Sequence, residues 1–464
     1  MTTANRAHWG SRLGFVLAAA GSAIGLGNIW KFPYITGVNG GGWFVLIYLG
    51  CILLVGLPVM AAEIFIGRTA QRSPVGAFRA LSRPGSPWMT FGWLGVAAGF
   101  VILSYYSVVA GWALHYVVLS IKGGFAGHTP DQVGSIFGTL FANGPVNVAW
   151  HVVFMIMTTL IVLGGIQAGV ERAARIMMPL LLFMMLALLV RAFSTPGFGE
   201  GFQFVFGAHA DKLHPAGILE ALGHAFFTLS LGMGAMITYG SYLKEDDDIM
   251  STSILVSVFD TVIALMACLV LFPIIFSYGL EPGAGPGLVF VTLPIAFGQL
   301  PGGAVWATVF FVLLVFAALT SAISILEVVV SYFIDERGFS RKKSTFLCGA
   351  VITLVGIPSA LSGGTMAFGE GFAKLTAPVF HLLGQESGKN WFDTFDYLAS
   401  NWLLPLGGMG ISLFVAWRVN PEARRRSFLA GTKFGRVYWG WVFLLKWIVP
   451  VGVLFVFLHA ISVI

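Results

Sequence analysis

The chain has 464 residues, of which 57% are hydrophobic and only 10% carry a charged side chain. Soluble domains average about 25% charged residues, so this composition excludes an ordinary soluble protein and indicates a polytopic membrane protein. The formal net charge is +6, and its meaning depends on which loops carry the basic residues.

Apolar segments long enough to cross a bilayer predict eleven helices in one transmembrane domain covering residues 1–464. The segments are 12–36, 41–67, 88–120, 146–165, 172–193, 216–243, 252–278, 304–334, 344–362, 391–417 and 437–461. The short start runs directly into the first span, so no cleavable signal peptide is predicted.

The first span contains Gly21, Gly25 and Gly27, followed by the polar residues Asn28 and Lys31. Glycine costs about 1 kcal/mol relative to alanine in a helix, so this pattern predicts an interrupted helix. Interrupted backbone at membrane depth must be buried in protein or line a wet cavity, where its free N–H and C=O groups can bind ions. A glycine-rich helix–helix packing face is the alternative, but it does not explain the two polar residues.

Basic residues follow the second, fourth, eighth and tenth spans, which alternation places on one side of the membrane. They are Arg68, Arg72, Arg79, Arg83, Arg172, Arg175, Arg337, Arg341, Lys342, Lys343, Arg418, Arg424, Arg425, Arg426, Lys433 and Arg436. The positive-inside rule assigns that side to the cytoplasm. A multi-pass protein of the cell inner (plasma) membrane with a cytoplasmic N-terminus is therefore predicted.

The sixth span carries a second interruption, with Thr228, Ser230, Gly232 and Gly234 inside an apolar run. It begins a second group of five spans, residues 216–417, whose topology is opposite to that of residues 12–193. Interrupted spans at matching positions of two inverted halves indicate a transporter whose site lies where the breaks meet. Residues 437–461 form the eleventh helix.

Other polar residues lie inside the predicted spans. The eighth span has one polar face, formed by Thr320, Ser324, Glu327, Ser331 and Asp335. Glu327 lies roughly 10 Å from Thr320 along the axis at 1.5 Å per residue. This face suggests an ion exit route, with a helix-packing stripe as the alternative.

Two lone acids and a tyrosine pair are further candidates. Glu63 and Asp260 are functional candidates because ionisable residues inside the hydrocarbon region of a membrane are costly. Glu63 could instead stabilise interrupted backbone through hydrogen bonds. Tyr105 and Tyr106 could be aromatic core, or one hydroxyl could point into a site. The broken segment 283–297 is predicted to form an extracellular cap.

Seven stretches of the chain together resemble a bacterial member of the neurotransmitter:sodium symporter family, which has the fold of the bacterial leucine transporter. The matching stretches, in order along almost the whole chain, are Arg6–Trp9, Gly21–Asn28, Asn39–Gly42, Tyr105–Tyr106, Phe226–Ser230, Gly287–Phe297 and Ala317–Ser321. The expected fold is all-α, with about eleven transmembrane helices in a 5+5 inverted repeat and discontinuous helices 1 and 6.

The resemblance implies two sodium sites built from oxygen ligands, which suit a hard cation. The first sodium would be bound by Ala23, Asn28, Thr228 and Asp260, and the second by Gly21, Ile24, Ala317, Thr320 and Ser321. An amino-acid substrate would contact Ala23, Leu26, Gly27, Ile102, Tyr106, Phe227, Thr228, Ser230, Met233, Ser324 and Ile325. Its carboxylate would meet the Leu26 and Gly27 N–H groups and the Tyr106 hydroxyl.

The resemblance also implies two gates. Outside, Phe227 and Tyr106 would close over the substrate beneath a Lys31–Asp396 pair. Inside, Arg6 would pair with Asp335, near Trp9 and Tyr242.

Four positions depart from the family's common pattern. This chain has Lys31 where many members have arginine, and His224 where members commonly have glutamine. It has Ala264 where some bacterial members have glutamate, and Asp260 where asparagine is usual. Asp260 lowers the charge of a site that holds two sodium ions and a zwitterion from +2 to +1. Animal members of the family use chloride for this purpose, so transport without a chloride requirement is expected. Asp260 could also bind a proton on the return step.

The predicted function is sodium-coupled import of a neutral, hydrophobic or aromatic L-amino acid by alternating access. A proton-coupled amino-acid transporter and a non-transporting amino-acid sensor are the alternatives. No nucleophile–base pair or metal-centre spacing is visible, so neither an enzyme nor a cofactor is predicted. Nucleic acid and an obligatory protein partner are not predicted either.

Overall fold

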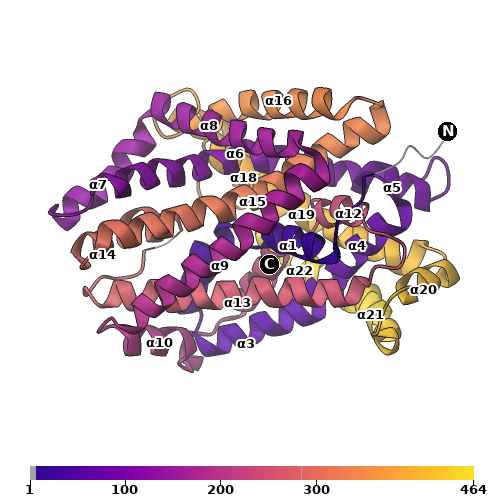
Figure 1. Ribbon diagram of the computed structural model, residues 1–464, viewed down its shortest axis with the longest axis horizontal. Helices are drawn as coiled ribbons and strands as arrows, with labels where there is room; N and C mark the ends of the chain where they lie inside the picture. Colours follow the sequence, from indigo (N-terminus) through magenta and orange to yellow (C-terminus); the bar gives the residue numbers. More distant parts are fainter. Residues whose placement is uncertain (1–6, 284, 464) are drawn as a thin grey trace.

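The computed structural model describes residues 7–283 and 285–463, and their regular elements are helices (Figure 1). Within these described ranges, nine continuous helical segments are long and apolar enough to cross a membrane. They are Gly42–Ala70 (α3, η2, α4), Met89–Ile121 (α6), Gly144–Leu163 (α8), Ile166–Phe193 (η3, α9), Ile249–Phe276 (α13), Gly303–Arg337 (α15), Arg341–Leu361 (α16), Trp391–Arg418 (α18, η6, α19, η7) and Gly435–Ala460 (η8, α21, η9, α22). Each matches one predicted span.

The first predicted span is an interrupted helix. α1 (Arg12–Ala23) ends before Gly25, and η1 (Gly27–Lys31) and α2 (Phe32–Val38) form a second segment that is bent by 55° from α1. At the end of α1, Ile24 has an extended backbone, with φ −72° and ψ 97°. The sequence prediction of a break around Gly25 is therefore confirmed.

The sixth predicted span is also interrupted. α11 (Pro215–Thr228) and α12 (Ala235–Gly240) are separated by a segment in which Ser230, Gly232 and Gly234 have positive φ angles. A Cβ at Gly232 would lie 2.3 Å from the Leu404 carbonyl oxygen, so only glycine fits there. Counting α1 with η1 and α2 as one bent span, the described residues contain up to ten helices long and apolar enough to cross a membrane. The short helices α11 and α12 occupy the sixth predicted span, so the count of eleven stays a prediction.

Glu63 on α4 braces the second break. Its Oε1 accepts a hydrogen bond of 2.7 Å from the Gly232 N–H, and its side chain is fully buried. This contact satisfies a backbone donor that the interruption removes from the helical ladder. Of the two roles considered for this acid, the structure shows the bracing one.

Shorter helices cover the two ends of the bundle. They are α5 (Pro74–Leu81), α7 (Pro130–Ala142), α10 (Phe198–Phe206), η4 (Ala210–Lys212), η5 (Leu288–Thr292), α14 (Leu293–Gln299), α17 (Glu370–Leu382) and α20 (Pro421–Leu429). α5 and α20 lie at one end, whereas α7, α10 and α14 lie at the other (Figure 1). The segment predicted as a cap thus forms the short helices η5 and α14, at the end opposite the basic helices α5 and α20.

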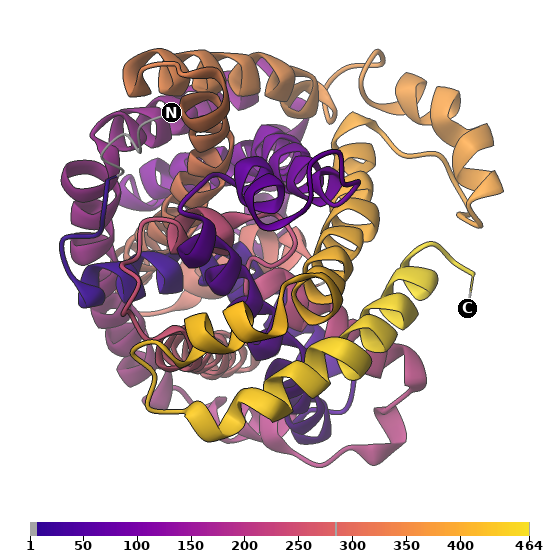
Figure 2. The same ribbon diagram turned by 90° about the vertical axis from the view of Figure 1, so that its right-hand side faces the viewer.

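α6 and α15 pack against each other at the centre of the bundle. In the most apolar 18-residue stretch of each helix, 78% of α6 and 83% of α15 is buried inside the protein. The same stretch of Gly435–Ala460 is only 28% buried. That last helix, coloured yellow, runs along the periphery when the bundle is viewed from the end that carries α20 (Figure 2). The interrupted helices α1 and α12 both pack against central α15. The eleventh span, by contrast, faces outward.

Candidate functional site

The two interruptions meet at a central cavity. The Ser230 hydroxyl in the second break donates a 2.7 Å hydrogen bond to the Ser22 carbonyl oxygen at the end of α1. Beside this contact lies a cavity of about 30 Å³. Its lining residues are Ser22, Ala23, Gly25, Leu26, Gly27, Asn28, Ile102, Tyr106, Phe227, Thr228, Ser230, Met233, Ser321 and Ile325.

Ten of the eleven predicted substrate contacts line this cavity, and Ser324 does not. The Ser324 hydroxyl is fully buried behind the wall, where it lies 2.7 Å from the Ser22 hydroxyl and 2.8 Å from the Ser321 carbonyl oxygen. It stabilises the wall rather than forming it. Ser22 takes the place in the lining that the sequence assigned to Ser324.

A buried polar cluster surrounds Asp260 at one side of the cavity. Asp260 Oδ1 accepts hydrogen bonds from Asn28 Nδ2 at 2.7 Å and from the Thr228 hydroxyl at 3.0 Å. The Tyr48 hydroxyl donates to Oδ2 at 3.4 Å, a contact that sequence reasoning missed. The structure thus brings together the three side chains predicted for the first sodium, with Ala23 in the adjoining cavity wall.

A second group of oxygen atoms lies between α1 and α15. The Ser321 hydroxyl lies 3.0 Å from the Ser22 carbonyl oxygen and 3.4 Å from that of Gly21. The Thr320 hydroxyl bonds to the Ala317 carbonyl oxygen at 3.1 Å.

Glycines allow the two helices to approach this closely. A Cβ at Gly21 would lie 3.0 Å from Thr320 Cβ, and one at Gly25 would lie 3.0 Å from the Ser321 hydroxyl oxygen. Of the residues predicted for the second sodium, Gly21, Ala317, Thr320 and Ser321 are therefore assembled where α1 meets α15, and buried Ile24 follows at the end of α1.

Tyr106 presents its hydroxyl to the first break. That oxygen is buried and has no hydrogen-bond partner in the described structure, and a Cβ added to Gly25 would lie 3.4 Å from it. Tyr105 packs against Phe392 with ring centroids 5.4 Å apart and does not line the cavity. The two tyrosines therefore have different environments, since Tyr106 lies in the site and Tyr105 lies in the aromatic core.

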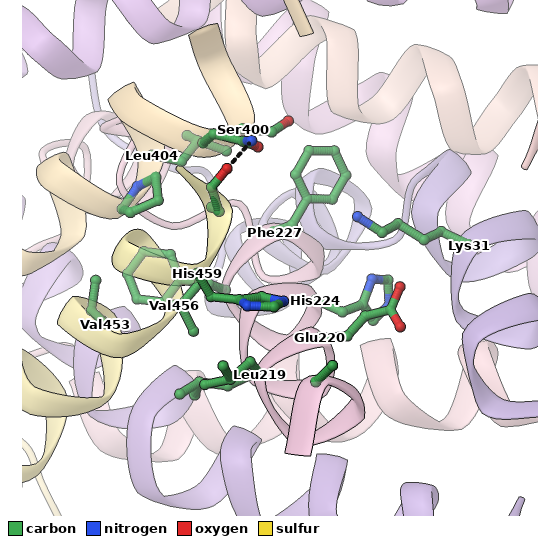
Figure 3. Close-up of a pocket in the computed structure, with 17 residues that line it drawn as sticks. Lys31, Leu219, Glu220, His224, Phe227, Ser400, Leu404, Val453, Val456 and His459 are labelled. Atoms are coloured by element: carbon green, nitrogen blue, oxygen red, sulfur yellow. Dashed lines mark hydrogen bonds between the residues drawn. The ribbon is translucent and has the colours of Figure 1, made fainter. Parts of the chain in front are cut away.

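Phe227 separates the central cavity from a wider pocket of about 390 Å³ on its other side, because its side chain lines both (Figure 3). The Lys31 ammonium lies 5.7 Å from the Phe227 ring centroid. Asp396 accepts a 3.1 Å hydrogen bond from the Ser400 hydroxyl. The predicted Lys31–Asp396 ion pair is not formed among the described residues, because the lysine points toward the aromatic ring instead.

His224 lies next to this boundary and is buried. Its ring stacks on Phe32 at a centroid distance of 5.5 Å and lies 5.8 Å from the Tyr48 ring. Neither ring nitrogen has a hydrogen-bond partner in the described structure. The substitution of histidine for the family's glutamine therefore places an aromatic, polar ring beside Lys31 (Figure 3).

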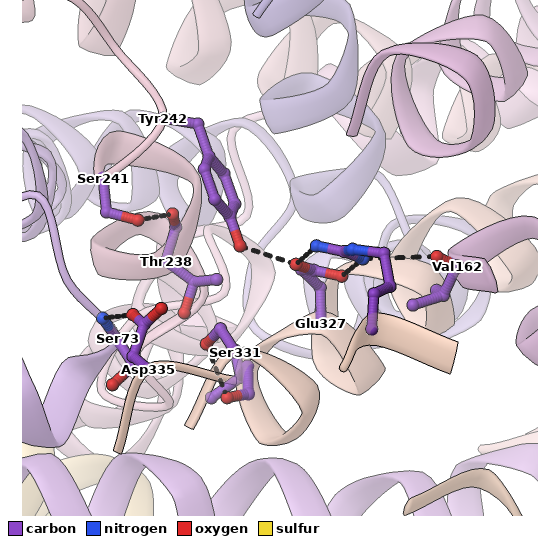
Figure 4. A network of polar contacts seen from close by, with 10 residues as sticks. Ser73, Val162, Thr238, Ser241, Tyr242, Glu327, Ser331 and Asp335 are labelled. Atoms are coloured by element: carbon purple, nitrogen blue, oxygen red, sulfur yellow. Dashed lines mark hydrogen bonds and ion pairs between the residues drawn. The ribbon is translucent and has the colours of Figure 1, made fainter. Parts of the chain in front are cut away.

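At the opposite end of the site, a polar network holds the segment that follows α12 against α15 and α16 (Figure 4). The Tyr242 hydroxyl donates to Glu327 Oε1 at 2.6 Å, and Arg341 binds the same carboxylate through two hydrogen bonds of 2.7 and 2.9 Å. Trp9 covers this region, with its indole N–H donating to the Tyr239 carbonyl oxygen at 3.0 Å. Glu327 and Tyr242 were predicted to be functional candidates, whereas Arg341 was predicted only as a basic residue of the cytoplasmic side.

The predicted polar stripe of α15 exists, but its side chains are bonded to neighbours rather than lining an open route. Ser331 bonds to the Val328 carbonyl oxygen, and Asp335 accepts a 2.6 Å hydrogen bond from the Ser73 N–H (Figure 4). Arg6 lies outside the described residues, so its pairing with Asp335 stays a prediction. In this structure the stripe contributes to closing the end of the site at which α5 lies.

Comparison with known proteins identifies the family. A model of the sodium:neurotransmitter symporter family matches residues 6–131 and 131–384 of the chain. This chain belongs to the sodium:neurotransmitter symporter family. It is therefore a sodium-dependent symporter of the membrane.

The chain is similar to sodium-dependent transporters of two bacteria and to a solved structure. The chain is 40% identical to an uncharacterized sodium-dependent transporter, YhdH, of Bacillus subtilis over 98% of each chain. It is 33% identical to an uncharacterized sodium-dependent transporter of Haemophilus influenzae over 99% of each. The crystal structure of MhsT in complex with L-phenylalanine superposes with a TM-score of 0.87 at 43% identity, covering 98% of this chain and 100% of that one. The predicted all-helical fold of the family is thereby confirmed.

Proposed function

We propose that this symporter imports a neutral, hydrophobic or aromatic L-amino acid together with two sodium ions, and that it does not require chloride. The observation that carries the proposal is the composition of the central cavity. Interrupted backbone and the unpartnered Tyr106 hydroxyl lie at one side, and the apolar side chains of Ile102, Met233 and Ile325 lie in the wall. This arrangement suits an amino acid whose polar atoms bind the breaks and whose side chain is apolar.

Two further observations support the substrate class. No lining residue of the cavity carries a charged side chain, so nothing there would pair with a charged side chain of the substrate. The similar protein MhsT was solved with L-phenylalanine. A cavity of about 30 Å³ holds only one or two waters, so substrate binding requires lining side chains to move. Phe227, at the boundary with the outer pocket, and flexible Met233 are the side chains that we expect to move.

The proposed ion sites are the Asp260 cluster and the oxygen atoms between α1 and α15. Moving one charge across about 100 mV supplies roughly 2.3 kcal/mol, so two sodium ions supply roughly 4.6 kcal/mol, or about three decades of accumulation. We further propose that the N-terminus is cytoplasmic in the plasma membrane, and that residues 12–193 and 216–417 are the inverted repeats. The clustering of α5 and α20 at one end of the bundle agrees with this orientation (Figure 1).

A binding competition tests the substrate class. Purified protein in sodium buffer is incubated with a radiolabelled hydrophobic amino acid and a panel of unlabelled L-amino acids. We expect phenylalanine, leucine and similar side chains to compete, and glutamate and lysine not to compete. Competition by charged amino acids as strong as that by phenylalanine would contradict the proposed pocket chemistry.

Replacing Tyr106 with phenylalanine is expected to weaken amino-acid binding roughly 10- to 100-fold. The change removes a hydroxyl that donates a hydrogen bond to the substrate carboxylate, and such charge-assisted bonds contribute about 1.5–3 kcal/mol. The matched control is Tyr105→Phe, because the Tyr105 ring packs on Phe392 outside the cavity. Equal losses in both variants would show that Tyr106 has no special role in binding.

Replacing Ser321 with alanine is expected to raise the sodium concentration needed for half-maximal binding about tenfold, since one oxygen ligand is lost. Ser331→Ala is the control on the same helix, because the Ser331 hydroxyl bonds only its own helix at the Val328 carbonyl oxygen. Sodium titrations of amino-acid binding distinguish the two variants. An unchanged sodium dependence in Ser321→Ala would remove this residue from the proposed second site.

A further inference from the structure

Lys446 is a charged residue on the outward-facing eleventh span. It lies in the π-helical segment η9 (Leu444–Ile448), and the rest of Tyr438–Ala460 is apolar apart from His459 near the end. Its Nζ lies 4.0 Å from the ring centroid of Trp417 and 5.5 Å from that of Trp447. The two tryptophans meet edge to face at 5.5 Å and are about half exposed, at 53% and 52%. Lys446 is therefore held between two aromatic rings on the outer surface of the bundle.

The backbone beneath this Lys446–tryptophan cluster is fixed by buried polar groups. The Ser412 hydroxyl donates a 2.6 Å hydrogen bond to the Leu445 carbonyl oxygen in η9. Buried Arg424 donates to the carbonyl oxygens of Val415 and Ala416, both at 2.8 Å, in the neighbouring segment η7 (Phe414–Arg418). The first contact fixes η9 to α19 (Leu404–Leu413), the second fixes η7 to α20, and η7 and η9 pack against each other, which positions Trp417 and Lys446.

The cluster lies where the tenth span ends. η7 ends at Arg418, after which Val419 has extended backbone and the chain turns into α20. Tryptophan and arginine at a helix end are typical of the membrane–water boundary. Because Trp417 contacts Lys446, the ammonium lies at the same level, although Lys446 is eleven residues inside its helical segment. The half-exposed rings of Trp417 and Trp447 show that this cluster lies on the outside of the bundle.

Exposed basic residues lie on the elements that flank Lys446 in the chain, together with the exposed acid Glu422 of α20. Arg425 and Arg426 on α20 and Arg436 before α21 (Tyr438–Phe443) are exposed at the same end of the bundle. No ion pair within 4.0 Å joins Lys446 to a carboxylate of the described residues. An ammonium on a lipid-facing surface, without an acidic partner among residues 7–283 and 285–463, finds its complementary charge in the lipid headgroup.

We propose that Lys446, Trp417 and Trp447 form a binding site for the phosphate headgroup of an anionic phospholipid. The lysine binds the phosphate, and the tryptophans hold the ammonium and lie against the upper acyl chains. Arg418 and Arg436 raise the local concentration of anionic lipid. This site lies away from the central cavity and does not depend on which amino acid is transported.

Native mass spectrometry of the full-length protein tests the proposal. Protein in detergent is titrated with phosphatidylglycerol or with zwitterionic phosphatidylcholine, and the bound lipids are counted. We expect preferential retention of phosphatidylglycerol by the unmodified protein. Lys446→Met should lower that retention about tenfold, the loss expected when one direct hydrogen bond to a charged group is removed. Lys446→Arg should retain the lipid.

Three controls keep the test specific. Arg436→Gln removes an exposed basic residue of the same region and should change retention much less. Thermal unfolding of Lys446→Met in phosphatidylcholine should match that of the unmodified protein, which shows that the variant is folded. A large excess of inorganic phosphate should not displace the lipid. The proposal is overturned if Lys446→Met retains phosphatidylglycerol normally, if Arg436→Gln loses as much, or if free phosphate displaces the lipid.

Discussion

Replacing Asp260 with alanine is expected to abolish sodium-driven uptake, with an apparent sodium affinity at least about 100-fold weaker. Asp260 is the only acidic side chain among the residues proposed to bind sodium, and it is fully buried. Removing one partner from a buried pair of charges costs about 3–5 kcal/mol, and 1.36 kcal/mol corresponds to a factor of ten. Sodium titrations of amino-acid binding measure this loss directly.

Asp260→Asn separates the charge from the shape of the side chain. The amide can still bond with Asn28, Thr228 and Tyr48, which now surround the carboxylate. Because the negative charge is lost, we expect uptake by this variant to be weak without chloride and to recover in part when chloride is added. The unmodified protein should take up substrate equally well when chloride is replaced by gluconate.

Asp393→Asn provides the control, because Asp393 is exposed near the start of α18 (Trp391–Tyr397). It makes the same chemical change far from the proposed ion sites. If Asp260→Asn worked normally in the absence of chloride, the charge argument would be wrong. If the unmodified protein lost its uptake in gluconate, the proposal of chloride independence would fail as well.

The second large effect is expected from Arg341→Met, which should destabilise the protein by about 3–5 kcal/mol. The change leaves Glu327, whose side chain is fully buried, without the guanidinium that now binds both of its oxygens. Because the pair also joins α15 to α16 beside Tyr242, its loss should loosen the closed end of the site. Thermal unfolding of purified protein measures the first effect.

Arg341→Met combined with Glu327→Gln should regain much of the lost stability, since no unpaired buried charge remains. Arg79→Met is the control, because Arg79 also pairs with a glutamate, Glu336, but is 52% exposed. Glu336 is only 5% exposed, but water reaches the guanidinium side of this pair, so we expect a smaller loss of stability than in Arg341→Met. A similar loss of stability in the Arg79 and Arg341 variants would show that burial of the pair is not the cause.

The sequence predicted the spans and both interruptions because these depend on local properties. Apolar length determines where a helix can cross, and glycines such as Gly25 and Gly232 determine where it breaks. The family resemblance then identified most of the cavity wall, since main-chain positions such as Ala23 and Thr228 follow from where the breaks lie. These features depend on a few neighbouring residues, which a single sequence contains.

The features that were missed depend on side-chain directions between distant segments. Tyr48 reaches Asp260 across 212 positions of the chain, and nothing in the local sequence of either residue indicates this bond. Lys31 has several rotatable bonds, so its turn toward Phe227 rather than Asp396 was not predictable from its position. Ser324 lies on the predicted face of α15, yet one hydrogen bond to Ser22 places it behind the cavity wall.

Uptake of radiolabelled amino acids into proteoliposomes, with an inward gradient of either sodium or potassium, tests the central claim most directly. The account predicts accumulation of a hydrophobic or aromatic L-amino acid only with the sodium gradient, and its loss in Asp260→Ala. Uptake driven equally well by a pH gradient in potassium would indicate proton coupling and contradict both proposed sodium sites. Binding without accumulation under any gradient would indicate a sensor and contradict coupled transport.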